Sequence, residues 1–158
     1  AAPAITIDGK ADDWEGISAL TTGKDRLKEL YAFSDGKHLY ILIYATEFST
    51  TYNNIFIDVN GPARGFQHWY YARSGAEYLV QNGNLWRSNS AAWDWSHIGP
   101  VQQATADDAE RGLKVLELAI DITDWEITDV IRMAVHIEAP DTFLPASPIG
   151  FVEVPVLE

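Results

Sequence analysis

The chain of 158 residues contains no cysteine, which excludes disulfide bonds, thiolate metal sites and a cysteine nucleophile. Basic residues are scarce: 11 Lys and Arg stand against 23 Asp and Glu, for a formal net charge of −12. Nucleic acids and anionic lipid surfaces are recognised mainly through Lys and Arg, so we expect neither as a partner. No run reaches the roughly 18 apolar residues that a membrane-spanning helix needs.

The residues that are present predict a folded domain, because 47% are hydrophobic and 12% are aromatic. The chain has no linker, internal repeat or low-complexity tract, so we expect one domain over residues 1–158. Its first residues, Ala1 to Ala4, lack the charged start and apolar stretch of a signal peptide. We expect that such a peptide has been removed or that the domain comes from a longer chain.

Alternation of apolar and polar residues is typical of strands with one buried face, and it recurs along the chain. The segment 38–47 is apolar on both faces, which predicts a central strand. Further strands are expected at 54–59, 113–120, 130–138 and 151–157, the last with Val152, Val154 and Val156 inward.

Turn sequences separate these strands, and Asp35-Gly36 and Asn82-Gly83 predict hairpins because both pairs tolerate positive φ. Helical turns are expected only around residues 12–17 and 122–125, and Trp14 and Trp125 there are expected to anchor their segments in the core. Many short strands joined by turns predict an all-β fold, an antiparallel two-sheet β-sandwich.

Aromatic residues are concentrated between Phe66 and Trp95, where eight of the chain's 19 Phe, Tyr and Trp occur. Sugars suit such a segment, because a pyranose stacks its CH face on a ring and offers hydroxyl groups to polar side chains. The candidate rings are Trp69, Tyr71, Trp86, Trp93 and Trp95, and the candidate polar partners are Gln67, Glu77, Asn82, Arg87 and Asp94. The alternative is that most of these rings belong to the core.

The segment Asp58-Val59-Asn60 leaves a strand and enters a Gly-Pro turn. Carboxylate, amide and carbonyl oxygens in such a turn are calcium ligands, so Asp58 and Asn60 are candidates for a calcium site. Alternatively, Asp58 caps its own turn through its side chain. The sequence is compatible with both a calcium site and a self-capped turn.

Catalytic motifs are missing from the sequence. The four histidines show no metal-binding spacing and no nucleophile motif beside them, and no Gly-rich phosphate loop occurs. With 23 acidic residues, a suggestive pair of carboxylates arises easily, so such a pair gives little support to a glycoside-cleaving site. We therefore expect a non-enzymatic protein.

Several segments in order resemble the carbohydrate-binding modules of family 9 and the related DOMON-like sandwich domains. These are the Ile-Asp-Gly turn and Asp-Trp pair at 7–14, the two strands at 30–47, the Ile-Asp-Val-Asn segment at 56–66, the Gly-Ala-Glu-Tyr strand at 75–83 and the Leu-Ala-Ile strand at 118–122. The resemblance implies a jelly-roll-like sandwich, often stabilised by calcium, that binds glycans beside a secreted enzyme. Asn60 stands where members often have Asp, which removes one charge from the expected calcium site.

Together these observations predict a non-catalytic carbohydrate-binding module, extracellular or periplasmic, that targets a linked or partner carbohydrate-active enzyme to a polysaccharide. If acidic groups surround the site, charge complementarity would favour a cationic amino sugar. The alternatives are a structural or adhesion module without sugar binding and a glycoside-cleaving domain.

Overall fold

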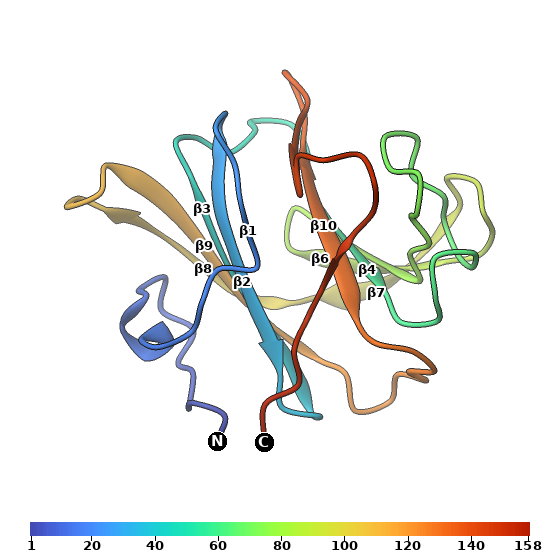
Figure 1. Ribbon diagram of the computed structural model, residues 1–158, viewed down its shortest axis with the longest axis horizontal. Coiled ribbons are helices and arrows are strands. Elements are labelled where there is room, and N and C mark those ends of the chain that lie inside the picture. Colours follow the sequence, from blue (N-terminus) through green and yellow to red (C-terminus); the bar gives the residue numbers. More distant parts are fainter.

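Alternating strands build two antiparallel sheets that pack face to face in a computed structural model describing residues 1–158 (Figure 1). The first sheet has the order β1 (Thr21–Thr22), β2 (Leu27–Ser34), β3 (His38–Ala45), β9 (Leu113–Asp121) and β8 (Gln102–Asp108). The second has the order β11 (Thr142–Leu144), β10 (Arg132–Ile137), β4 (Asn53–Asp58), β5 (Tyr78–Gln81), β6 (Asn84–Ser88) and β7 (Trp95–Pro100), and β12 (Val152–Glu153) also pairs with β10. The predicted all-β sandwich is confirmed.

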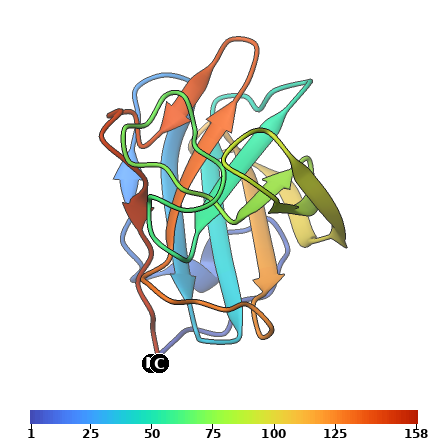
Figure 2. The ribbon, with the colours of Figure 1, turned by 90° about the vertical axis from the view of Figure 1, so that its right-hand side faces the viewer.

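Helical structure is limited to one 3-10 turn, η1 (Asp12–Trp14), as expected near the N-terminus. The second expected helical turn is a hydrogen-bonded turn instead, in which Trp125 N donates to Ile122 O at 3.0 Å. No helix is long and apolar enough to cross a membrane. The two chain ends lie close together at the bottom of both ribbon views (Figures 1 and 2).

The main core lies between the two sheets, and β3 contributes to it from the centre of the first sheet. Leu39, Ile41 and Ile43 point into this core, as the alternation predicts. Leu42 and Tyr44 on the opposite face are also buried, because the N-terminal segment covers them. The expectation of a central strand apolar on both faces is confirmed.

Trp14 anchors the N-terminal segment, as predicted, and is only 4% exposed. Its indole N–H donates to Glu117 Oε2 at 2.8 Å, and Glu117 Oε1 accepts the backbone N–H groups of Asp8 and Gly9 at 2.8 and 2.9 Å. Glu117 is fully buried, and its hydrogen bonds join the N-terminal turn to β9. Trp125 packs against the main core through a stacked contact with Tyr78.

The last segment departs from its prediction. Val154 is buried, whereas Val156 is 59% exposed, so the expectation that Val156 points inward is wrong. The reason is a change of pairing partner: β12 pairs with β10, but Pro155 O then accepts from Ser34 N and Leu157 N donates to Ser34 O at the end of β2. The alternation of inward and outward side chains therefore ends where the chain passes from one sheet to the other.

Two connections lie over the outer face of the second sheet, at residues 59–77 and 89–94; both fall in the green segments that cross in front of the strands in Figure 2. The longer connection closes on itself, because Phe66 and Ala76 exchange backbone hydrogen bonds of 2.9 and 3.0 Å. Gly75 packs so tightly there that a Cβ atom would overlap the carbonyl groups of Arg64 and Gly61. These two connections and the strands beneath them form the candidate site.

Candidate functional site

The outer face of the second sheet is built by strand alternation. On β4, Ile55 and Ile57 face the core, so Asn54 and Phe56 face outward. Register then places His136 of β10 on one side of Asn54 and Gln81 of β5 on the other. Segments far apart in the sequence therefore present their side chains on one surface.

A pocket of about 260 Å³ lies on this outer face, beneath the two connections. Its lining residues are Asn54, Phe56, Phe66, His68, Trp69, Trp93, His136, Glu138 and Asp141. Phe56 and Phe66 are buried and stack with ring centroids 5.5 Å apart, and His68 packs edge-on against Phe56 at 4.9 Å. The pocket thus has an aromatic floor and a rim of amide and carboxylate groups.

Two tryptophans flank this floor and are open to solvent. Trp69 is 70% exposed and packs beside His68, whereas Trp93 is 56% exposed and packs edge-on against Phe66. Exposed indole rings are costly to leave in water, and two on one pocket mark a surface suited to a ligand with apolar faces.

The aromatic surface continues past Trp93 into a second depression of about 330 Å³, lined by Leu79, Gln81, Trp86, Trp93, Asp94 and Trp95. Trp93 lines both depressions, so they form one continuous surface. The indole N–H groups of Trp86 and Trp95 are buried and donate to no acceptor in the chain. Each such unpaired donor costs about 1–3 kcal/mol relative to a satisfied one, so these two rings are held by packing alone.

A chain of hydrogen bonds runs through two buried histidines on the pocket floor. Tyr70 N donates to His68 Nδ1 at 3.0 Å, so the His68 proton is on Nε2. His68 Nε2 lies 3.1 Å from His136 Nδ1, and His136 Nε2 lies 2.9 Å from Asp141 Oδ1. In this arrangement each imidazole carries one proton, donated toward Asp141, and neither ring is charged.

The pKa of His68 is consistent with a neutral ring. Burial and the neighbouring His136 lower this pKa to about 4. The charged groups that line the pocket are the carboxylates of Glu138 and Asp141. Arg26 approaches the same turn, but it donates to the backbone oxygens of Glu138 and Pro140. The pocket therefore has an acidic rim with no lining Lys or Arg.

Five of the predicted site residues lie together on this surface: Trp69, Trp86, Trp93, Trp95 and Asp94. Gln67 belongs to the covering connection, but its amide donates to Pro62 O and Gly65 O within that connection. Tyr71 is 4% exposed, and its hydroxyl group donates to Pro145 O, so its ring is part of the interior.

Three predicted polar residues lie elsewhere. Arg87 pairs across the ladder with Tyr78, a core residue, so it is on the opposite face from Trp86. Glu77 turns toward the end of β4, where its Oε1 accepts from Val59 N and Asn60 N at 2.7 and 3.1 Å. Asn82 is in the hairpin turn between β5 and β6, with a φ of 48°.

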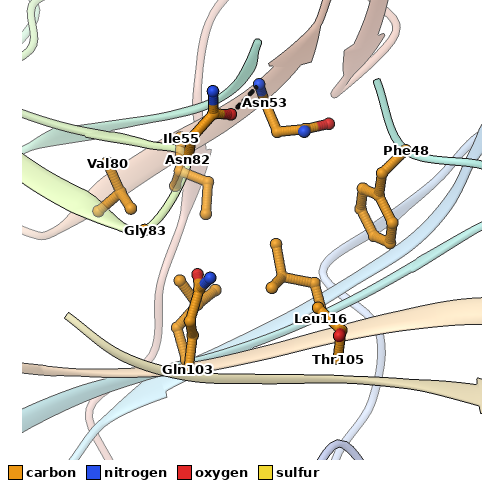
Figure 3. Close-up of a pocket in the computed structure, with 10 residues that line it drawn as sticks. Phe48, Asn53, Ile55, Val80, Asn82, Gly83, Gln103, Thr105 and Leu116 are labelled. Atoms are coloured by element: carbon orange, nitrogen blue, oxygen red, sulfur yellow. Dashed lines mark hydrogen bonds between the residues drawn. The ribbon is translucent and has the colours of Figure 1, made fainter. Parts of the chain in front are cut away.

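Asn82 lines a different cavity, of about 130 Å³, between the two sheets (Figure 3). Figure 3 shows Phe48, Val80 and Leu116 around this space, with Asn82 Oδ1 accepting from Asn53 N at 2.9 Å along one side. The cavity has half the volume of the aromatic pocket and lacks an exposed ring, so it suits a stacked sugar less well.

The two calcium candidates are engaged inside their turn. Asp58 Oδ1 accepts from Asn60 N and Gly61 N at 3.1 and 2.8 Å, and its Oδ2 is 3.7 Å from the Arg132 guanidinium. Asn60 points its amide nitrogen at three oxygens: those of Val59 and Glu126 and the Thr128 hydroxyl group. No three His, Asp or Glu side chains come close enough to hold a metal ion. Asp58 therefore caps its own turn, as the second interpretation expects.

Several residues of the pocket escaped the sequence analysis: Asn54, Phe56, Phe66, His68, His136, Glu138 and Asp141. Alternation along β4 and β10 does put Asn54, His136 and Glu138 on an outward face, which is a usable signal. That these two strands are neighbours depends on the sheet order, which the alternation does not contain.

The chain matches no known protein family and no curated protein.

Proposed function

We propose that this domain is a non-catalytic glycan-binding module that uses the outer face of the second sheet. The observation that supports this most is the pair of exposed rings, Trp69 and Trp93, that line a pocket together with two carboxylate groups. The rings would stack on sugar faces, while Gln81 and Asp94 in the adjoining depression would bond hydroxyl groups. Secretion and a linked or partner carbohydrate-active enzyme belong to the same proposal.

Affinity electrophoresis in gels that contain soluble polysaccharides tests the proposal. We expect at least one glycan to retard the protein, and Trp69→Ala and Trp93→Ala to abolish the retardation, because each removes a stacking surface. Trp125→Ala is not a suitable control, since Trp125 packs on the core. Tyr52→Ala is a better one, because Tyr52 is exposed at 48% and lines neither aromatic depression.

The alternatives give different results in the same assay. A structural or adhesion module would migrate unchanged in every glycan gel and would need a protein partner for its aromatic surface. A glycoside-cleaving domain would release soluble products from the polysaccharide, with Glu138 and Asp141 as the carboxylates in the pocket. Retardation without product release supports the module.

Calcium at the turn after β4 is a separate proposal with its own test. If Asp58 and Asn60 hold calcium, EDTA lowers the melting temperature by several degrees, since a ligand bound to the folded state stabilises it. If Asp58 only caps its turn, the melting temperature does not change. The Arg132 cation beside Asp58 favours the second outcome.

A further inference from the structure

We infer that the aromatic pocket selects a positively charged sugar, an amino sugar whose amine is not acetylated. This inference rests on the proposed glycan binding and deepens it.

The rim of the pocket is negatively charged, because Glu138 and Asp141 line it. Asp141 is half exposed at its side chain, so the oxygen that does not accept from His136 Nε2 is available to a ligand. Glu138 stands at the same rim, with one oxygen accepting from Asn54 Nδ2 at 3.1 Å. An ammonium group placed between them would gain charge-assisted hydrogen bonds from both carboxylates.

The histidines do not offset this negative charge. Because Tyr70 N occupies His68 Nδ1, the hydrogen-bond chain leaves one proton on each ring, and both imidazoles are neutral. His136 instead orients Asp141 by donating to it, while its own ring is held by His68. The buried pair therefore acts as a neutral support for an acidic rim.

Aromatic walls strengthen the preference. An ammonium group over the face of an indole gains a cation–π attraction, worth most when the cation is partly removed from water. Trp69 and Trp93 line the same pocket as the two carboxylates and are both exposed. A neutral acetamido group at the same position gains neither the cation–π attraction nor the ion pair.

The test compares three β-linked oligosaccharides of equal length: a glucosamine oligomer, its N-acetylated counterpart and a cello-oligosaccharide. Tryptophan fluorescence titration at mildly acidic pH, where the amine is protonated, reports binding directly at the rings. We expect the glucosamine oligomer to bind about tenfold more tightly than the N-acetylated one, the order of one half-exposed ion pair combined with a cation–π contact. The ratio should shrink as salt rises from about 0.01 M to about 0.15 M, because the screening length falls from about 30 Å to about 8 Å.

Variants that remove single charges test whether the rim carboxylates cause the preference for the amine. Glu138→Gln and Asp141→Asn should each reduce several-fold the ratio of the affinity for the glucosamine oligomer to the affinity for the cello-oligosaccharide, because each removes one carboxylate charge from the pocket rim. Glu110→Gln is the matched control, because Glu110 is exposed and outside the pocket, and it alters the net charge by the same amount. An equal effect of Glu110→Gln would assign the preference to the overall charge of −12 and overturn the local inference.

Selection of the amine and glycan binding itself give different results in these experiments. If all three oligomers bind equally, or the N-acetylated one binds best, the charge inference is wrong while glycan binding stands. If none binds and none of the polysaccharide gels retards the protein, both are wrong. Circular dichroism melting of each variant shows that it is folded before its affinity is interpreted.

Discussion

Glu117 is a fully buried carboxylate that accepts three hydrogen bonds, from the Trp14 indole and from two backbone N–H groups. A buried charge is tolerated only when its hydrogen-bonding capacity is met, and here the donors come from a segment more than one hundred residues away in the sequence. This single side chain thus closes the N-terminal turn onto the first sheet.

Glu117→Ala should lower the free energy of unfolding by about 2–4 kcal/mol, because it leaves two buried donors and one partly buried donor without an acceptor. Glu117→Gln should cost less, since its amide oxygen can still accept from one side. Urea unfolding followed by tryptophan fluorescence measures both. Glu110→Ala is the control, an exposed glutamate expected to change stability by no more than about 0.5 kcal/mol. Equal midpoints for the two alanine variants would contradict this role of Glu117.

At the scale of elements, strand alternation was the most dependable guide. It predicted strands at the positions of β3, β4, β9 and β10, because each of these strands keeps the same environment on each face along its length. It failed at the last segment, where Val156 follows a transfer from β10 to the end of β2. It also said nothing of the connection 59–77, whose shape depends on close packing of Gly75 rather than on any period.

Gly75→Ala should displace the connection 59–77, because the new methyl group would overlap the carbonyl oxygens of Arg64 and Gly61. We expect a loss of about 1–3 kcal/mol in the free energy of unfolding and at least about a tenfold weaker glycan binding, since Trp69 is on this connection. Urea unfolding and gel retardation measure the two effects. Ala63→Ser, at an exposed position of the same connection, should change neither. Full glycan binding by Gly75→Ala would show that the site does not need this connection.

At the scale of the whole molecule, two buried groups give stability opposite pH dependences. Burial and the neighbouring Asp58 raise the pKa of Glu77 to about 7, whereas burial lowers the pKa of His68 to about 4. The raised pKa of Glu77 stabilises the fold fully below about pH 4.5, and this contribution is lost as pH rises to about 7. The lowered pKa of His68 stabilises the fold above about pH 6.5, and this contribution is lost as pH falls to about 4.

Glu77→Gln separates the two groups, because glutamine resembles the protonated acid at every pH. We expect the variant and the wild type to be equally stable below about pH 4.5 and the variant to be more stable above about pH 7. Thermal melting across this range measures the difference, and the His68 contribution cancels since both proteins contain it. A difference that is constant with pH would show that Glu77 does not titrate in the folded protein in this range.

By itself the sequence determined the all-β class, the strand faces, the hairpin turns and the cluster of aromatic residues, because these depend on local periodicity and on the backbone freedom of Asn82-Gly83 and similar pairs. Only the tertiary structure decided which rings face solvent and which polar groups accompany them. Trp69, Trp93, His136 and Asp141 meet because the register of β4 with β10 and the path of two connections bring them together. The same long-range packing turned Tyr71 inward and put Arg87 on the opposite face of the sheet.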